Sequence, residues 1–192
     1  PLEDLSRLPG EHNLRNILAA SAACLCAGVP GESFSQSFAS FEPLPHRLEY
    51  VGEYAGRRFF NDSISTTPES TIAALESFNE PIVLLAGGYD KQVDLTQMSS
   101  AIADKVKAVS LMGETGSRIC EQMNEAAAPK VINCAVNESL PDAMCWAINQ
   151  SQPGDIVLLS PGCASYDWFI DFRDRGEQFV DSVHRWASHQ TN

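Results

Sequence analysis

Three separated segments place glycine, hydroxyl and charged residues directly after apolar runs. They are residues 61–67 (Asn-Asp-Ser-Ile-Ser-Thr-Thr), 87–91 (Gly-Gly-Tyr-Asp-Lys) and 160–172, which begins Ser-Pro-Gly-Cys-Ala-Ser-Tyr. These residue types suit a small anionic ligand, because glycine lets the backbone approach it and hydroxyl and ammonium groups donate hydrogen bonds. The longest and most unusual of the three follows the apolar run Ile156–Leu159.

The first segment leads into a predicted helix, which Thr67 caps and Pro68 begins. A helix N-terminus carries free N–H groups and partial positive charge, so it favours carboxylates and phosphates. Ser65 and Thr66 could add hydroxyl donors, and Asp62, with no neighbouring charge, needs a partner. The alternative interpretation is a plain capped helix start.

Three further features could contact a ligand. Lys91 would place a cation beside the glycine pair, or would be solvated after a glycine turn. Arg47 could hold a phosphate through two hydrogen bonds across a cleft between domains, or could be a surface arginine in a linker. Asn13 and Asn16 are one helical turn apart, and two amides on one face can bind the edge of a base such as adenine. The alternative for them is a helix cap and an incidental asparagine.

Other chemistries have no support in the sequence. The phosphate-binding spacing GxxxxGK[S/T] is absent, the four histidines lack metal-ligand spacing, and no Ser/His/Asp triad can be argued. We therefore expect neither a metal site nor a catalytic residue in this stretch. The loop 113–116 also leads from a strand into a helix and could line the rim of the site, but we interpret it as structural.

Composition limits the partners and the compartment. The chain has 192 residues, a net charge of −12 and a pI of about 4.6, which argues against nucleic acids and anionic membranes. None of the six cysteines forms a CxxC pair, which is typical of buried thiols in a reducing cytosol. No apolar run approaches the ~20 residues of a membrane span. We expect a cytoplasmic protein.

The elements that must position these residues alternate along the chain. A hairpin at 48–54 and 57–60 precedes strands at 82–86, 108–112, 131–134 and 156–159. Helices are predicted at 13–28, 32–41, 67–77, 94–104, 115–127, 139–150 and 173–188. This pattern predicts an α/β fold with a mostly parallel, doubly wound sheet, in which ligands bind beyond the C-terminal ends of the strands.

The first two helices cannot bury their apolar faces alone. Gly28 fits the position after the first helix, and Pro43 and Pro45 interrupt the pattern after the second. We therefore predict a boundary that separates residues 1–43, the end of a preceding domain, from a domain at 44–192.

Five motifs in this order resemble the Mur ligases of peptidoglycan synthesis, and most closely their glutamate-adding members. The motifs are Leu-Pro-Gly-Glu-His-Asn at 8–13 with Asn16, Pro-His-Arg at 45–47, Asn-Asp-Ser at 61–63, Gly-Gly at 87–88 with Lys91, and 158–165 with Phe172, Arg175 and Gly176. The resemblance covers nearly the whole chain, and its last motif is the most specific.

The resemblance implies an ATP- and Mg²⁺-dependent ligase that joins glutamate to UDP-N-acetylmuramoyl-L-alanine through an acyl phosphate. Residues 1–43 would be the last helices of its central ATPase domain, and 44–192 its Rossmann-like C-terminal domain. The P-loop and Mg²⁺ ligands would lie upstream, so these residues alone would be inactive. The implied glutamate contacts are Thr66, Lys91, Ser165, Tyr166 and Phe172. The implied ATP contacts are Asn13, Asn16, Arg47 and Asp62.

One position departs from the family pattern. A lysine usually follows Asn-Asp-Ser, but this chain has Ile64, which cannot pair a carboxylate. A charge-assisted hydrogen bond contributes roughly 1.5–3 kcal/mol, enough to change the preferred enantiomer. D-glutamate is the family default, and L-glutamate is a second hypothesis.

Two other functions stay open. A ligase of the folylpolyglutamate type would show competition by folate and no use of a UDP-sugar, although the motif at 160–172 argues against it. A binding module without catalysis would lack an upstream P-loop. For the ligase we expect a monomer.

Overall fold

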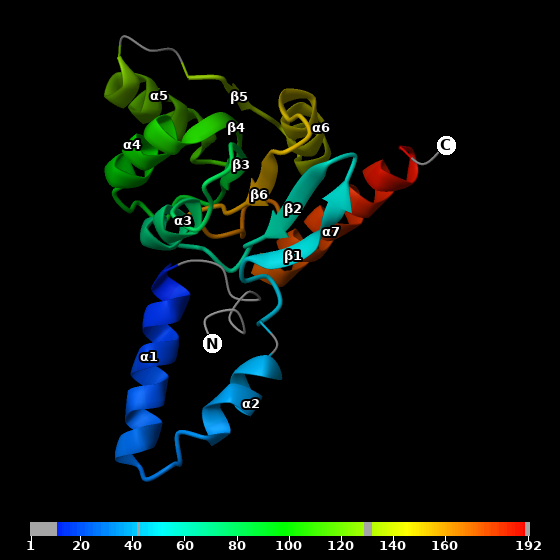
Figure 1. Cartoon of the computed structure of the whole chain (residues 1–192). Helices are drawn as coiled ribbons and strands as arrows, with labels where there is room; N and C mark the ends of the chain where they lie inside the picture. The colour runs from blue at the N-terminus through cyan, green and yellow to red at the C-terminus, as the bar shows by residue number, and fades with distance from the viewer. Residues whose placement is uncertain (1–10, 42, 129–131, 191–192) are drawn as a thin grey trace.

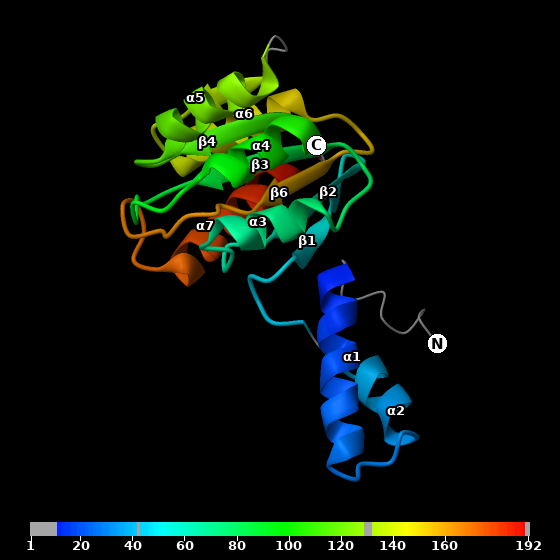
Figure 2. The same ribbon diagram turned by 90° about the vertical axis from the view of Figure 1, so that its left-hand side faces the viewer.

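The computed structural model of the chain describes residues 11–41, 43–128 and 132–190. Two helices, α1 (Glu11–Cys26) and α2 (Ser33–Ala39), project away from a larger α/β unit formed by residues 49–188 (Figure 1). The second view shows the same separation (Figure 2). The predicted motif at 8–10 and the predicted strand start at Val131 lie outside the described residues.

The described residues form one six-stranded sheet with the order β1-β2-β6-β3-β4-β5. The strands are β1 (Glu49–Tyr54), β2 (Arg57–Asn61), β3 (Ile82–Gly87), β4 (Val106–Met112), β5 (Cys134–Val136) and β6 (Ile156–Leu159). Only the β1–β2 hairpin is antiparallel among these pairs. The predicted fold, a mostly parallel sheet that begins with a hairpin, is confirmed.

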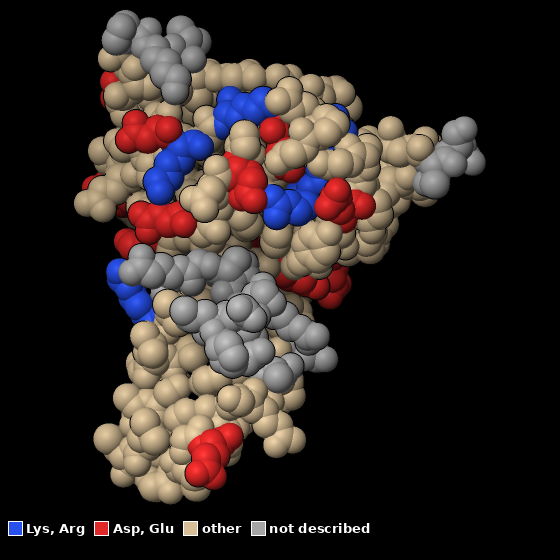
Figure 3. All heavy atoms as spheres, in the orientation of Figure 1, with Lys and Arg blue, Asp and Glu red and all other residues tan. Residues whose placement is uncertain are grey.

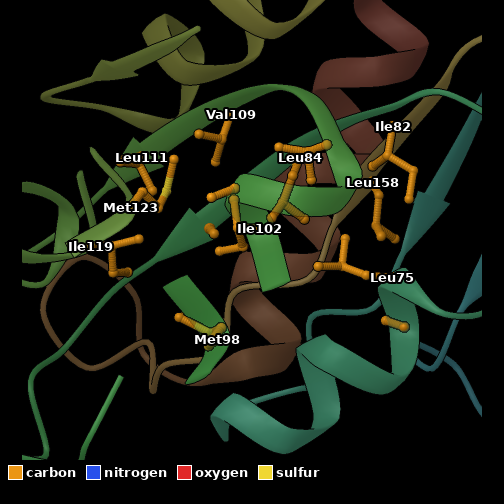
Figure 4. Packing of buried hydrophobic residues seen from close by; sticks show 14 of the residues in the cluster. Leu75, Ile82, Leu84, Met98, Ile102, Val109, Leu111, Ile119, Met123 and Leu158 are labelled. Atoms are coloured by element: carbon orange, nitrogen blue, oxygen red, sulfur yellow. The ribbon is translucent and has the colours of Figure 1, made fainter. Parts of the chain in front are cut away.

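Five helices cover the two faces of this sheet (Figure 1). They are α3 (Pro68–Leu75), α4 (Thr96–Lys105), α5 (Gly116–Ala127), α6 (Leu140–Gln150) and α7 (Phe172–Ser188). Leu75, Ile102 and Met123 of the first three pack on one face (Figure 4). Met144 and Phe179 of the last two pack on the other. The central strands are buried on both faces, which explains their continuous apolar runs.

Local sequence determines where several helices begin and end. Thr67 is the N-cap of α3 and Pro68 its first residue, as predicted. Gly28 has φ +86° after α1, and its N–H donates to the carbonyl of Leu25 at 3.0 Å. The next N–H, that of Val29, donates to the carbonyl of Cys24 at 3.0 Å. The helix therefore ends at a glycine, as predicted.

Most predicted boundaries differ from the observed ones by one or two residues, and two of the differences change an interpretation. Asn13 does not cap α1, because the helix already begins at Glu11 and includes Asn13 in its first turn. The edge strand β5 runs from Cys134 to Val136 rather than over 131–134. The position of β5 is determined by its backbone pairing with β4. Because this edge strand is partly exposed, its hydrophobic pattern was too weak to predict where it begins. No helix in the described ranges has the length and apolar character needed to cross a lipid bilayer.

Candidate ligand-binding site

The three segments singled out in the sequence are neighbours beyond the C-terminal ends of β2, β3 and β6. The N–H of Gly87 donates to the carbonyl of Pro161 at 2.8 Å, and Tyr89 donates to Ala164 at 2.9 Å. The N–H of Gly162 donates to the carbonyl of Ser65 at 2.9 Å. The loop at 160–172 thus joins the other two, because β6 lies between β2 and β3.

A pocket of about 250 Å³ lies where these loops meet. Its lining is Thr66, Thr67, Pro68, Glu69, Tyr89, Asp90, Lys91, Val93, Asp94, Thr115, Gly162, Cys163 and Ala164. Two of the predicted glutamate contacts, Thr66 and Lys91, belong to it. Lys91 is the one cation among these lining residues, beside three carboxylates. One of these, Asp90, pairs with Arg118 at 2.8 Å.

The other predicted glutamate contacts lie around the pocket rather than in its wall. Ser165 is buried directly after the lining residue Ala164. Tyr166 is 66% exposed, and its ring meets Tyr89 edge-on with the ring centroids 6.2 Å apart. Phe172 is not among the lining residues, and its ring meets that of His46 edge-on with the centroids 6.0 Å apart.

The predicted ATP contact Asp62 already has partners within the chain. Its carboxylate accepts hydrogen bonds from the Leu48 N–H at 3.1 Å and the Ser160 hydroxyl at 2.7 Å. Burial raises the pKa of Asp62 above 3.8, although these hydrogen bonds and the charge of Arg47 act in the opposite direction. Arg47 and Asp62 line a common cavity of only about 40 Å³.

The two asparagines on α1 differ in accessibility. Asn13 is buried and Asn16 is exposed. Neither lines the pocket at the strand ends. Within the described ranges, no group of three or more His, Cys, Asp or Glu side chains could hold a metal ion.

Arg175 holds several segments of the site together, although its place in the last motif came with no predicted role. Its guanidinium is fully buried and donates to the hydroxyl and carbonyl of Ser63 at 3.0 and 2.9 Å. It also donates to the carbonyls of Cys163 and Ala164 at 3.1 and 3.2 Å. Burial lowers the pKa of Arg175 to about 10, so it stays charged at neutral pH. In α7 Arg175 lies four positions before the buried Phe179, so the two residues share one face of the helix. This spacing is the sequence signal that could have indicated a buried arginine.

Thr115 is a second residue whose role the sequence did not reveal. Its hydroxyl accepts a hydrogen bond from the Gly88 N–H at 3.0 Å and lies 3.3 Å from the sulfur of Cys163. Gly88 has φ +148°, and a side chain there would collide with the carbonyl oxygen of Ala164. The loop at 113–116 therefore contributes Thr115 to the pocket lining and holds Gly88 through a hydrogen bond.

The fold and the site define an α/β domain with a ligand pocket at the carboxyl edge of a parallel sheet. Residues 46–163 match the family model described as Mur ligase, glutamate ligase domain, and the chain belongs to this family.

Curated relatives are similar over nearly the whole chain. A UDP-N-acetylmuramoylalanine–D-glutamate ligase from Latilactobacillus sakei is 39% identical over 95% of this chain. A protein of the same name from Shouchella clausii is 43% identical over 92% of it. The chain spans only 39% and 38% of the lengths of these two relatives.

Solved structures share the fold at low identity. UDP-N-acetylmuramate–alanine ligase from Thermotoga maritima superposes with a TM-score of 0.69 at 17% identity, over 93% of this chain and 39% of that one. Folylpolyglutamate synthase from Mycobacterium tuberculosis gives 0.60 at 20% identity, over 81% and 39%. These likenesses establish the fold alone.

Proposed function

We propose that this chain is part of a longer ATP-dependent ligase that joins D-glutamate to UDP-N-acetylmuramoyl-L-alanine in peptidoglycan precursor synthesis. The names of relatives at 39–43% identity support this reaction and this enantiomer. The alanine carboxylate would be activated as an acyl phosphate. The glutamate amine would then attack it, forming the amide and releasing phosphate.

The proposed part of this chain is to hold glutamate. The observation that carries this proposal is the strand-end pocket, in which Lys91 can pair a carboxylate and Thr66 can donate its hydroxyl. At about 250 Å³ the pocket is smaller than the roughly 300–1,000 Å³ of drug-sized sites, which suits an amino acid. Ser165, Tyr166 and Phe172 are the further proposed contacts. Fixing the amine beside an activated carboxylate raises the reaction rate by positioning.

The proposed contacts with ATP are Arg47, Asp62, Asn13 and Asn16. Arg47 is the member suited to phosphate, because its guanidinium can donate two parallel hydrogen bonds. The buried carboxylate of Asp62 attracts that cation, so Asp62 would also help to position Arg47 beside the nucleotide. We assign Mg²⁺ binding and the P-loop to other parts of the longer protein.

We propose that residues 1–43 are the end of the preceding ATPase domain. In support, Leu18 and Leu25 of α1 are 60% and 55% exposed. The visible face of the α1–α2 region carries few charges, whereas Lys, Arg, Asp and Glu crowd the α/β unit (Figure 3). We also propose a cytoplasmic monomer without nucleic-acid or membrane partners, which the net charge of −12 supports.

The enantiomer is tested by single-turnover ligation with the full-length enzyme. Ile64 supplies no cation where the family usually has lysine, and its N–H is already bonded to the carbonyl of His46 at 3.1 Å. We expect faster ligation of D-glutamate. Faster ligation of L-glutamate would overturn the proposed enantiomer and leave the reaction class intact.

The pocket is tested by Lys91→Met in the full-length enzyme. Loss of one charge-assisted contact should raise KM for glutamate roughly 10- to 150-fold, with a smaller change in KM for ATP. Lys105→Met is the matched control, because Lys105 is exposed on α4 and only approaches Glu76 at 3.9 Å. An unchanged KM for glutamate in the Lys91 variant would refute the assigned pocket.

A further inference from the structure

Two thiols meet away from the pocket, between α5 and the edge strand β5. The sulfur atoms of Cys120 and Cys134 are 2.9 Å apart. Both side chains are partly buried against the core on that face of the sheet. The expectation of buried thiols is wrong for Cys24, Cys26 and Cys145, which are exposed, whereas Cys163 is buried with its sulfur beside Thr115.

The separation of the two sulfur atoms is close to what a covalent bond requires. A disulfide bond is about 2.05 Å long, so the sulfurs need to approach by less than 1 Å. Cys120 is on a helix and Cys134 on a strand, and both elements are anchored by packing on β4. The backbone therefore holds the pair together without a CxxC spacing in the sequence.

The two thiols would take different parts in an oxidation, one as the sulfur that is oxidised and the other as the sulfur that resolves the product. Burial and the neighbouring thiol raise the pKa of Cys134 to about 12, so Cys134 keeps its proton at neutral pH. We assign the first oxidation to Cys120, and the sulfur of Cys134, 2.9 Å away, is in place to resolve the product.

We propose that Cys120 and Cys134 are a modification site that forms a reversible intramolecular disulfide on exposure to a peroxide. The sulfur of Cys120 attacks the peroxide O–O bond and becomes a sulfenic acid, and the other oxygen leaves as water. The sulfur of Cys134 then displaces hydroxide from that sulfenic acid, and its proton leaves with the hydroxide as a second water. In sum, two thiols lose two electrons and two protons, which hydrogen peroxide takes up as two waters.

The bond would join α5 to the edge of the sheet. In the described sheet β1 and β5 are the two edge strands, and β5 is the shorter of them, with three residues against six. The bond would close the loop from Cys120 to Cys134 and so restrict the unfolded chain. We expect the oxidised protein to melt roughly 5–10 °C higher than the reduced one.

The experiment treats the full-length protein with hydrogen peroxide, blocks free thiols with an alkylating agent, and maps peptides by mass spectrometry. Trypsin and a glutamyl endopeptidase separate the candidates, because cleavage after Glu138 parts Cys134 from Cys145. We expect a peptide pair linked through Cys120 and Cys134 that dithiothreitol releases. Cys120→Ser and Cys134→Ser should each abolish the link, and Cys145→Ser should leave it intact.

Two results would overturn the proposal. The first is recovery of Cys120 and Cys134 as separately alkylated or separately over-oxidised peptides from protein whose circular dichroism is still that of the folded state. The second is a link that survives in either serine variant, which would mean that another cysteine forms it. Glutamate ligation does not enter the assay, so the outcome is independent of the proposed function.

Discussion

Replacing Arg175 by methionine tests whether one buried cation holds the pocket walls together. Methionine fills a similar length of the interior but cannot donate. The carbonyl of Ala164 keeps a hydrogen bond from Tyr89, and the hydroxyl of Ser63 keeps its bond to the carbonyl of Phe172. The carbonyl oxygens of Ser63 and Cys163 lose the hydrogen bonds that Arg175 donates to them.

The magnitude follows from these two oxygen atoms. Each buried acceptor left without a donor costs about 1–3 kcal/mol, which gives a gross loss of about 2–6 kcal/mol. Part of this is recovered, because burial lowers the pKa of Arg175 to about 10 and so disfavours its charge. We expect a net loss of about 2 kcal/mol in the free energy of unfolding. For a chain of this size that corresponds to a melting temperature roughly 4–8 °C lower.

The assay is urea unfolding of the 192-residue chain followed by circular dichroism, with Arg173→Met as the control. Arg173 is two residues away and 63% exposed, and it makes a surface pair with Asp171 at 3.2 Å. Such pairs contribute about 0–1 kcal/mol, so the control should unfold almost as the parent does. If both variants lose the same free energy, the reasoning about Arg175 is refuted.

Two further predictions concern Gly88 and Asp62. Gly88→Ala should lose at least about 2 kcal/mol more stability than Gly154→Ala, because both have positive φ but only the Cβ at Gly88 meets the carbonyl of Ala164. Equal losses in thermal melts would contradict this. Burial raises the pKa of Asp62 above 3.8, so the folded state holds that proton more tightly and stability falls as pH rises through the shifted pKa. In urea unfolding, Asp62→Asn should show a smaller fall in stability as the pH rises above about 3.8. An equal fall in variant and parent would exclude Asp62 as its source.

The sequence predicts much of the fold because local patterns determine it. The continuous apolar runs of β3 and β6 indicate strands buried on both faces. Thr67-Pro68 and Gly28 indicate helix ends through backbone conformations that few other residues favour. The three ligand segments were predictable as neighbours, because each follows a strand of a parallel sheet.

Other features depend on long-range packing that no local pattern contains. The insertion of β6 between β2 and β3 determines which loops touch. The hydrogen bonds of Arg175 join residues 112 positions apart. The contact between Cys120 and Cys134 depends on the observed register of β5, which the apolar pattern misplaced.

The order of the strands also affects the time at which the site can form during synthesis. β6, the last of the described strands along the chain, lies inside the sheet between β2 and β3, which end 95 and 69 residues before β6 begins. Until it arrives, β2 and β3 have no shared neighbour, and the loops that carry Thr66 and Lys91 have no third wall. Non-local pairing of this kind forms slowly, since a long loop must close before its contacts can form. A nascent chain stalled before β6 should therefore have helices but no pocket, and the site should appear only as the sheet is completed.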